Sequence, residues 1–362
     1  MFLQEITIRQ HIGYGTKNTL YFVGNSMINC PLISVVLPTY NVAQYLQQCL
    51  ESVAAQTYRN IEVIVIIDGA TDGSHEIAQK FCKIDSRFSV YWQENAGSGP
   101  ARNAGLAHCH GELVMFVDPD DWIEPKLLEK LYKAQCEGNY DLVASERTVA
   151  LCDKSGEIVR TVPKHYMDET IVGQQEVRQA FMRMLEMLVV SNPTQKLYKI
   201  SLIQEYNILF PDLRRSQDIV FNYRYYNHIS SLCLIEYSGY NYRKNFQASI
   251  GNVESDYYKT IVLLYNDYMS LYKMWSLPFP EQKMADWFLR ERLNSYLQKM
   301  VGLKLDYRES IENPVIGKII QTSRPQKKHL RITRSLLLSK SYALLNFFLS
   351  LILIAKRNHI RK

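Results

Sequence analysis

The feature that most constrains the fold is a nearly continuous apolar run, Ile61–Ile67 (IEVIVII), between two segments with helical spacing. Such a run is typical of a strand buried on both faces of a parallel sheet. Shorter runs of this kind occur at Ile33–Leu37, Phe88–Trp92 and Leu113–Val117, and amphipathic helical patterns separate them. Four strands with intervening helices predict βαβ units and therefore a doubly wound α/β sheet.

Composition and charge exclude several classes of protein. Of the 362 residues, 47% are apolar and 22% charged, which excludes wholesale disorder and a polytopic membrane protein. The net charge is +6, but eleven Lys or Arg and no Asp or Glu follow Glu312, so residues 1–312 carry −5. An acidic body argues against nucleic-acid binding. Seven scattered cysteines without a CxxC pair, and no secretory signal, predict reduced thiols in a cytoplasmic protein.

The pattern divides the chain into four parts. The βαβ pattern begins at Ile33, the signals loosen after Asp121, and residues 254–305 are helical and rich in aromatic side chains. We expect an N-terminal extension (1–32), an α/β domain (33–245, with halves 33–122 and 123–245), a helical region (246–329) and a basic, apolar tail (330–362).

Polar residues follow the predicted strands at the edge where doubly wound sheets bind ligands. The first strand leads into Pro38-Thr39-Tyr40, where the tyrosine could stack on a nucleobase. The alternative is a simple turn into a helix with Asn41 as its N-cap. The second strand ends at Asp68, which could accept a hydrogen bond from a base or a ribose hydroxyl, or could simply belong to a turn. Asp72 beyond it is expected to cap the next helix.

The fourth strand leads into three clustered carboxylates, Asp118, Asp120 and Asp121. They repel one another unless a cation or a hydrogen-bond network compensates. Mg²⁺ and Mn²⁺ favour such oxygen ligands and need only one or two of them when substrate phosphates supply the rest. Helix capping before Pro125 would account for one aspartate, not for three. The cluster therefore predicts a metal or nucleotide site.

A glycine-bearing loop, Glu94–Gly105 (ENAGSGPARNAG), precedes the fourth strand and opens a helix. Its backbone N–H groups could bind an anion, and Arg102 could pair with a phosphate. The loop has neither the GK[ST] of a Walker motif nor a GxGxxG fingerprint, which argues against a kinase, an ATPase or a dehydrogenase.

Four ordered motifs, SVVLPTYN, IEVIVIIDGATDGS, ENAGSGPARNAGL and GELVMFVDPDDWI, resemble the nucleotide-sugar-binding half of the family 2 glycosyltransferases, which adopt the GT-A fold. The similarity continues to Tyr240-Asn241-Tyr242-Arg243 and covers residues 33–245. The resemblance implies that Pro38, Thr39 and Tyr40 hold the nucleobase and that Asp68 reads it, with Arg102 beside the nucleotide. Asp118 and Asp120 match the family's DxD motif: Asp118 would lie toward the ribose and donor sugar, and Asp120 would bind Mn²⁺ or Mg²⁺. Asp218 matches the general base of the family's "ED" motif.

The implied reaction moves a sugar from a nucleotide donor, most often UDP-linked, to a saccharide or lipid-linked saccharide, with inversion. This would be a metal-dependent hexosyl or N-acetylhexosaminyl transfer in polysaccharide biosynthesis. The sequence departs from the family pattern at Ile67 (usually Asp), Gln217 (usually Glu) and Pro119 within the DxD motif. The alternative is therefore a catalytically inactive nucleotide-sugar-binding or saccharide-binding partner subunit on the same fold.

The tail carries an apolar segment, Tyr342–Ala355, flanked by basic residues. At 14 residues it is shorter than the ~20 needed to span a bilayer. Basic flanks around a short apolar helix favour peripheral contact with the anionic inner face of the cell membrane. The alternative is a helix docked on the protein's own body or on a dimer partner.

Overall fold

The computed structural model describes residues 20–23, 26–153, 155–165, 168–245 and 255–360. The chain divides into two compact units. The first unit contains residues 1–177 and 189–245, and the second contains residues 178–188 and 246–362. The basic residues Arg361 and Lys362, and residues 1–19 of the expected extension, lie outside the described residues.

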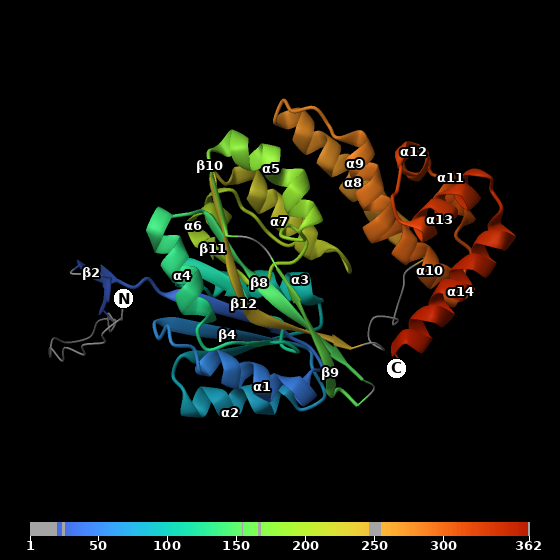
Figure 1. Cartoon of the computed structure of the whole chain (residues 1–362). Coiled ribbons are helices and arrows are strands. Elements are labelled where there is room, and N and C mark those ends of the chain that lie inside the picture. Colours follow the sequence, from blue (N-terminus) through green and yellow to red (C-terminus); the bar gives the residue numbers. More distant parts are fainter. Residues whose placement is uncertain (1–19, 24–25, 154, 166–167, 246–254, 361–362) are drawn as a thin grey trace, which may run out of the picture. The chain divides into compact units, whose positions relative to one another are not determined.

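The first unit is built on a ten-stranded mixed sheet (Figure 1). Its order is β10-β12-β8-β11-β6-β3-β4-β5, with β7 paired to β12 and β9 to β8. The strands are β3 (Ile33–Thr39), β4 (Ile61–Asp68), β5 (Phe88–Gln93), β6 (Leu113–Phe116), β7 (Trp122–Ile123), β8 (Leu142–Cys152), β9 (Ile158–Lys164), β10 (Glu169–Val172), β11 (Lys196–Lys199) and β12 (Ser231–Asn245).

The four strands predicted from the apolar runs are confirmed, and they are mutually parallel. In the sheet these four strands lie in the order β5-β4-β3-β6. The chain runs from β3 through β4 to β5 on one side of β3 and then places β6 on its other side, so the direction of the connections reverses between β3 and β6. Ligands of doubly wound sheets bind at such a switch point, outside the carboxyl ends of the strands. The long strand β12 pairs parallel with β8, with an irregular register between Ile235 and Tyr240.

Helices cover both faces of this sheet, as expected for the fold. They are α1 (Ala43–Ala54), α2 (Ser74–Ile84), α3 (Ser98–Ala107), α4 (Leu127–Gly138), α6 (Ile200–Glu205) and α7 (Gln217–His228). A further helix, α5 (Gln174–Glu186), begins in the first unit and continues into the second. Alternate residues of β3 and β4 pack with α1, α2 and α4 in one apolar core. On the opposite face α3 lies so close to β3 that a Cβ on Gly105 would lie 2.3 Å from Cγ1 of Val36. Phe116 there contacts Tyr198, Phe210 and Phe221 edge to face.

The start of α1 differs from the prediction. Asn41 is not its N-cap, because its backbone has φ 46° and its Oδ1 accepts from the amide of Thr71 at 2.8 Å. The amide of Ala43 instead donates to Asp72 Oδ2 at 2.8 Å. Asp72 also accepts from the amide of Ser74 at the start of α2, at 3.1 Å. One carboxylate from the loop after β4 therefore serves the N-termini of two helices.

Residues before Ile33 also contain secondary structure that the pattern missed. Strands β1 (Leu20–Val23) and β2 (Ser26–Asn29) pair antiparallel in a two-stranded sheet. All seven cysteines lie in the described part of the chain and none of them is in a disulfide.

The second unit is helical. It contains α8 (Tyr257–Met274), α9 (Glu281–Phe288), a π-helical segment (Leu289–Leu293), α10 (Asn294–Gly302), α11 (Arg308–Glu312), α12 (Pro314–Thr322), α13 (Lys328–Leu338) and α14 (Tyr342–Ile360). Its core is aromatic: Phe181 packs edge to face on Tyr268, Tyr272 and Trp275. In the described part of the chain, no helix is both long and apolar enough to cross a bilayer.

Candidate active site

Three predicted site residues follow three neighbouring parallel strands. Tyr40 comes directly after β3, Asp68 is the last residue of β4, and Asp118 lies two residues beyond β6. Because β4, β3 and β6 are adjacent and parallel, these residues lie along the same edge of the sheet. This is the edge at which the sequence predicts ligand binding.

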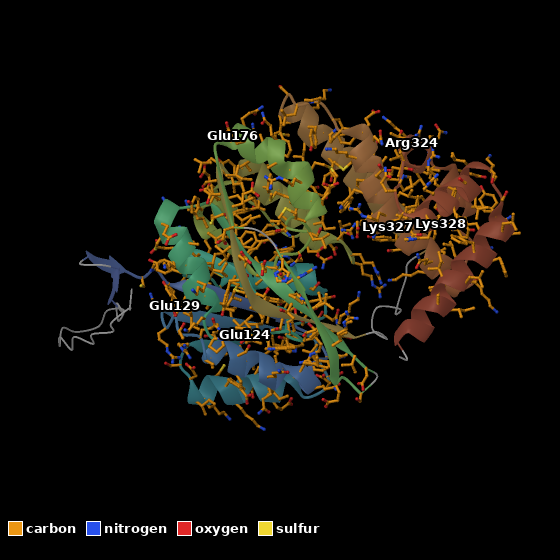
Figure 2. The ribbon with its side chains drawn as sticks, in the orientation of Figure 1. Glu124, Glu129, Glu176, Arg324, Lys327 and Lys328 are labelled. Carbon is orange, nitrogen blue, oxygen red and sulfur yellow. The ribbon has the colours of Figure 1, made fainter. Side chains whose placement is uncertain are left out.

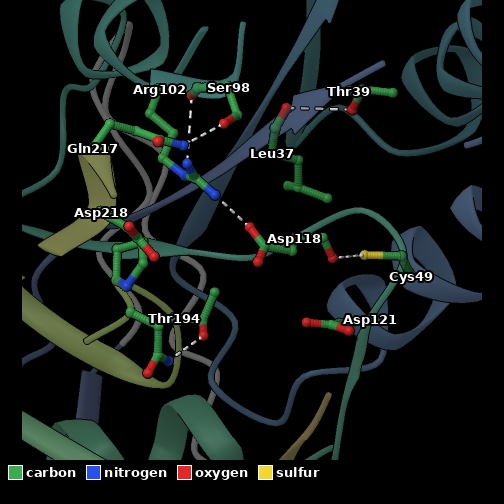
Figure 3. Close-up of polar contacts among 12 residues, drawn as sticks. Leu37, Thr39, Cys49, Ser98, Arg102, Asp118, Asp121, Thr194, Gln217 and Asp218 are labelled. Atoms are coloured by element: carbon green, nitrogen blue, oxygen red, sulfur yellow. Dashed lines mark hydrogen bonds and ion pairs between the residues drawn. The ribbon is translucent and has the colours of Figure 1, made fainter. Parts of the chain in front are cut away.

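Arg102 and Asp118 form an ion pair at this edge. Nη2 of Arg102, in the middle of α3, donates to Oδ1 of Asp118 at 2.6 Å (Figure 3). The arginine side chain is 6% exposed and the aspartate 29% exposed. A buried guanidinium therefore holds a carboxylate that is still open to a ligand. Arg102 also lies over the ring of Phe210, 5.4 Å from its centroid.

The other two aspartates of the cluster lie in different surroundings. Burial and the nearby charge of Asp118 raise the pKa of Asp120 to about 6. Burial, then the charges of Asp120 and Asp118, raises the pKa of Asp121 well above its usual range. The cluster therefore concentrates negative charge that the protein compensates only in part.

Asp121 is held by residues from β12, far away in the sequence. The hydroxyl of Tyr240 donates to its Oδ2 at 2.7 Å, and the amide of Arg243 donates to its Oδ1 at 2.7 Å. The same hydroxyl accepts from the amide of Asp118 at 3.2 Å. Asp121 is 1% exposed, so its side chain stabilises the loop after β6 from the protein interior. It does not cap α4, which has Lys126 as its N-cap and no side-chain cap.

Arg243 is a functional candidate to which the sequence motif Tyr240-Asn241-Tyr242-Arg243 assigns no role. Its guanidinium lies between the rings of Tyr45 and Trp122, 4.5 and 4.9 Å from their centroids. Its Nε donates to the carbonyl of Asp120 at 2.9 Å. Arg243 is 122 or more residues from these aspartates, so no local pattern could have revealed the contact.

A divalent cation fits this donor set. No three His, Cys, Asp or Glu side chains among the described residues are arranged to hold a metal ion by themselves. Mg²⁺ and Mn²⁺ do not require that, since one or two carboxylates suffice when phosphates and water complete the shell. The raised pKa of Asp120 marks a carboxylate whose charge lacks a full counter-charge, and a cation would supply it.

Asp68 and the residues at the end of the first strand differ in their exposure to solvent. Asp68 is 2% exposed and accepts three hydrogen bonds: from Gln93 Nε2 at 2.7 Å, and from the amides of Ala96 and Gly97 at 2.9 and 2.8 Å. Its carboxylate thus fixes the loop that leads into α3. In the first strand, Pro38 and Thr39 are buried, and Thr39 Oγ1 donates to the carbonyl of Leu37 at 3.3 Å. Tyr40 is 49% exposed.

Asp218 lies in the first turn of α7. Its Oδ1 accepts from the amide of Ile219 at 2.9 Å. Lys196, at the start of β11, is fully buried and donates through Nζ to the carbonyls of Asn192 and Thr194. Burial and the charge of Arg147 lower the pKa of Lys196, against an opposing contribution from Asp218. Figure 3 shows Asp218, Arg102 and Asp118 in one close-up.

The chain matches known proteins through this unit. The family model "Glycosyl transferase family 2" matches residues 34–183. The putative glycosyltransferase EpsH of Bacillus subtilis is 30% identical over 239 residues, which cover 65% of this chain and 67% of that protein. Glycosyltransferase GlyG of Streptococcus pneumoniae is 34% identical over 227 residues, covering 62% and 74%.

Among solved structures, Staphylococcus aureus TarS 1–349 in complex with UDP has a TM-score of 0.62. It is 22% identical, and the match covers 88% of this chain and 90% of that one. The same fragment in complex with UDP-GlcNAc has the same score and identity. At this identity the likeness establishes the fold, which agrees with the one predicted from the motifs.

Proposed function

The chain belongs to glycosyl transferase family 2, and on that premise we propose that it is an inverting, metal-dependent glycosyltransferase. The donor is a nucleotide sugar, UDP-linked by preference, and the acceptor is a saccharide or a lipid-linked saccharide. The transferred group is a hexosyl or N-acetylhexosaminyl unit. The observation that carries the proposal is that hydrogen bonds through α3 connect Asp118, on the donor side, to the first turn of α7, which holds Asp218.

The residues account for the chemical demands of the reaction. The carboxylate of Asp218 takes the proton from the acceptor hydroxyl, whose oxygen attacks the anomeric carbon while the bond to the diphosphate oxygen breaks. A Mn²⁺ or Mg²⁺ ion on Asp120 would neutralise the charge that develops on the leaving diphosphate. Asp118, fixed by Arg102, orients the ribose and the donor sugar. Tyr40 stacks on the base, and Asp68 holds the loop that lines this edge.

The proposal is tested by nucleotide release from a panel of UDP-, GDP- and CMP-sugars with Mn²⁺, repeated in EDTA. We expect slow release of UDP from one donor, lost in EDTA. Asp218→Asn should lower transfer by about 10²–10⁴-fold, the usual contribution of a general base, and keep Mn²⁺-dependent UDP binding. Asp212→Asn, a neighbouring exposed aspartate, is the matched control and should keep full activity. Activity that survives D218N would refute the assignment of the base.

We further propose that α14 places the enzyme on the anionic inner face of the cell membrane. Leu344, Phe347, Leu351 and Ile354 recur at helical spacing and are 48–65% exposed, whereas Leu345 and Leu349 are buried. The apolar stripe belongs to a stretch that carries eleven basic and no acidic residues after Glu312. Figure 2 shows three exposed members, Arg324, Lys327 and Lys328, around the start of α13. Anionic lipid attracts such charges, by about 1 kcal/mol each near the surface.

Vesicle flotation tests this localisation. Wild-type protein should float with vesicles that contain anionic lipid and less with neutral vesicles. Leu344→Ser with Phe347→Ser should abolish flotation. Ile84→Ser with Val159→Ser, two exposed apolar residues of the other unit, should leave it unchanged. Equal flotation of both double variants would contradict the assignment of the surface.

A further inference from the structure

Gln217 immediately precedes the proposed base and contacts a residue of another helix. Its Nε2 donates to Oγ of Ser98, in the first turn of α3, at 2.7 Å (Figure 3). Gln217 is 9% exposed, and its Oε1 has no hydrogen-bond partner among the described residues. Within the described part of the chain, the bond to Ser98 is therefore the only hydrogen bond of this buried side-chain amide.

The segment before α7 docks on α3 through further contacts. Asn103 of α3 bonds the backbone of Phe210 twice: its Nδ2 donates to the carbonyl at 2.8 Å, and its Oδ1 accepts from the amide at 2.9 Å. A Cβ on Gly99 would lie 3.1 Å from both Cγ of Gln217 and the carbonyl oxygen of Pro211. The first turns of α3 and α7 are thus in close contact, with no free room between them for a larger side chain.

The same helix α3 carries the residue that holds the donor side. Arg102 lies one turn beyond Ser98, and its Nη2 bonds Asp118 at 2.6 Å. Its Nη1 also donates to the carbonyl of Ser98 at 3.5 Å. Gln217, Ser98, Arg102 and Asp118 therefore form a continuous chain of contacts from the base helix to the predicted DxD motif (Figure 3).

We propose that Gln217 is a positioning residue: its bond to Ser98 fixes Asp218 at the distance from Asp118 that the transfer requires. This inference rests on the proposed function, because it takes Asp218 as the base. In-line displacement depends on the alignment of donor, acceptor and base, and a misplacement of about 1 Å can cost about 10²-fold in rate. A residue at position 217 that cannot bond Ser98 leaves the first turn of α7 free to shift, although every catalytic group is still present.

The test compares Gln217→Leu, Ser98→Ala and the double variant. The readouts are the rate of UDP release from the donor found active in the panel, and the affinity for UDP with Mn²⁺. Each single variant should lower kcat by about 10- to 100-fold and change UDP affinity by less than about twofold. Both changes remove the same bond, so the double variant should be no slower than the slower single variant.

Two further variants separate positioning from a general loss of structure. Gln135→Leu is the matched control, because Gln135 is also 9% exposed and donates through Nε2 to one side chain, Asn139, at 3.2 Å. It should keep kcat. Gln217→Glu should restore most of kcat relative to Q217L, because a carboxylate can accept from the hydroxyl of Ser98.

Several outcomes would overturn the inference. If the fold-losses of kcat in the two single variants multiplied in the double variant, Gln217 and Ser98 would act separately. A parallel loss of UDP affinity, or an equal loss of kcat in Q135L, would mean that the change acts on donor binding or on the fold as a whole. Failure of the proposed function itself would show differently, as full activity in D218N.

Discussion

Asp120→Asn should make the metal-free protein more stable while it removes the predicted metal ligand. Burial and the charge of Asp118 raise the pKa of Asp120 to about 6, from an ordinary value near 3.8. A folded-state pKa above the unfolded one means that ionisation destabilises the fold. The penalty is absent below about pH 4, grows as the pH rises toward 6, and is constant above that. Asparagine has no charge to bury. We therefore expect D120N to add about 3 kcal/mol to the free energy of unfolding at pH 8, about half of that at pH 5, and little at pH 4.

The assay is native-state hydrogen exchange in EDTA at pH 5, 6.5 and 8, followed in peptides from β3, β4 and β6. Exchange in these peptides measures the free energy of unfolding of the unit that contains the site. Asp85→Asn is the control of opposite sign, because hydrogen bonds from Arg87, 2.6 Å away, lower the pKa of Asp85. Its stabilisation is present above the unfolded pKa and is lost as the pH falls through the folded one. D85N should therefore weaken protection to the same extent at pH 5, 6.5 and 8, because all three lie above the unfolded pKa of the carboxyl near 3.8.

A neutral or destabilising D120N at pH 8 would refute this reasoning, as would an effect that does not change between pH 5 and pH 8. Adding Mn²⁺ with UDP should reverse the order of stability of D120N and the wild-type protein. A ligand that binds only the folded state stabilises it by mass action. Wild-type protein should gain protection, and D120N, without the proposed ligand atom, should gain little.

Three further predictions use the same exchange assay. Tyr240→Phe should cost about 2–3 kcal/mol, because it removes the hydroxyl that donates to the buried carboxylate of Asp121. Asp72→Ala should cost about 1–2 kcal/mol, since Asp72 accepts from the first amides of both α1 and α2. Lys196→Met should gain stability relative to wild type as the pH falls from 10 toward 7, because the burial that lowers the pKa of Lys196 penalises its protonated form in the folded state alone. A difference in the free energy of unfolding between K196M and wild type that does not change with pH would contradict the last prediction.

Much of the sheet and the general place of the site were predictable from local sequence. The run Ile61–Ile67 is apolar enough to require burial on both faces, and the structure shows it as β4 between β3 and β5. Asp68 and Asp118 could be assigned to one edge because parallel strands have their carboxyl ends on the same side. The motifs also predicted the family, because the similarity they carry, in order and spacing, extends over residues 33–245.

Capping and support of the site were less predictable, because they depend on residues distant in sequence. Asn41 has the right side chain for an N-cap, yet Asp72 takes that role, since the loop after β4 crosses the start of α1. Tyr240 and Arg243 support Asp121 from β12, 119 and 122 residues away. No periodicity records such contacts, because they exist only after β12 has paired with β7 and β8.

The sequence by itself determined the α/β architecture, the order of the strands' polar ends and the chemical types gathered there, because burial and backbone periodicity act over a few residues. Only the tertiary structure decided what each of these groups does. It made Arg102 the partner of Asp118, turned Asp121 inward onto Tyr240, and brought Gln217 to Ser98 across 119 residues. The physical reason is that desolvation and hydrogen bonding depend on which groups meet, and the packing of α3, α7 and β12 on the sheet selects them.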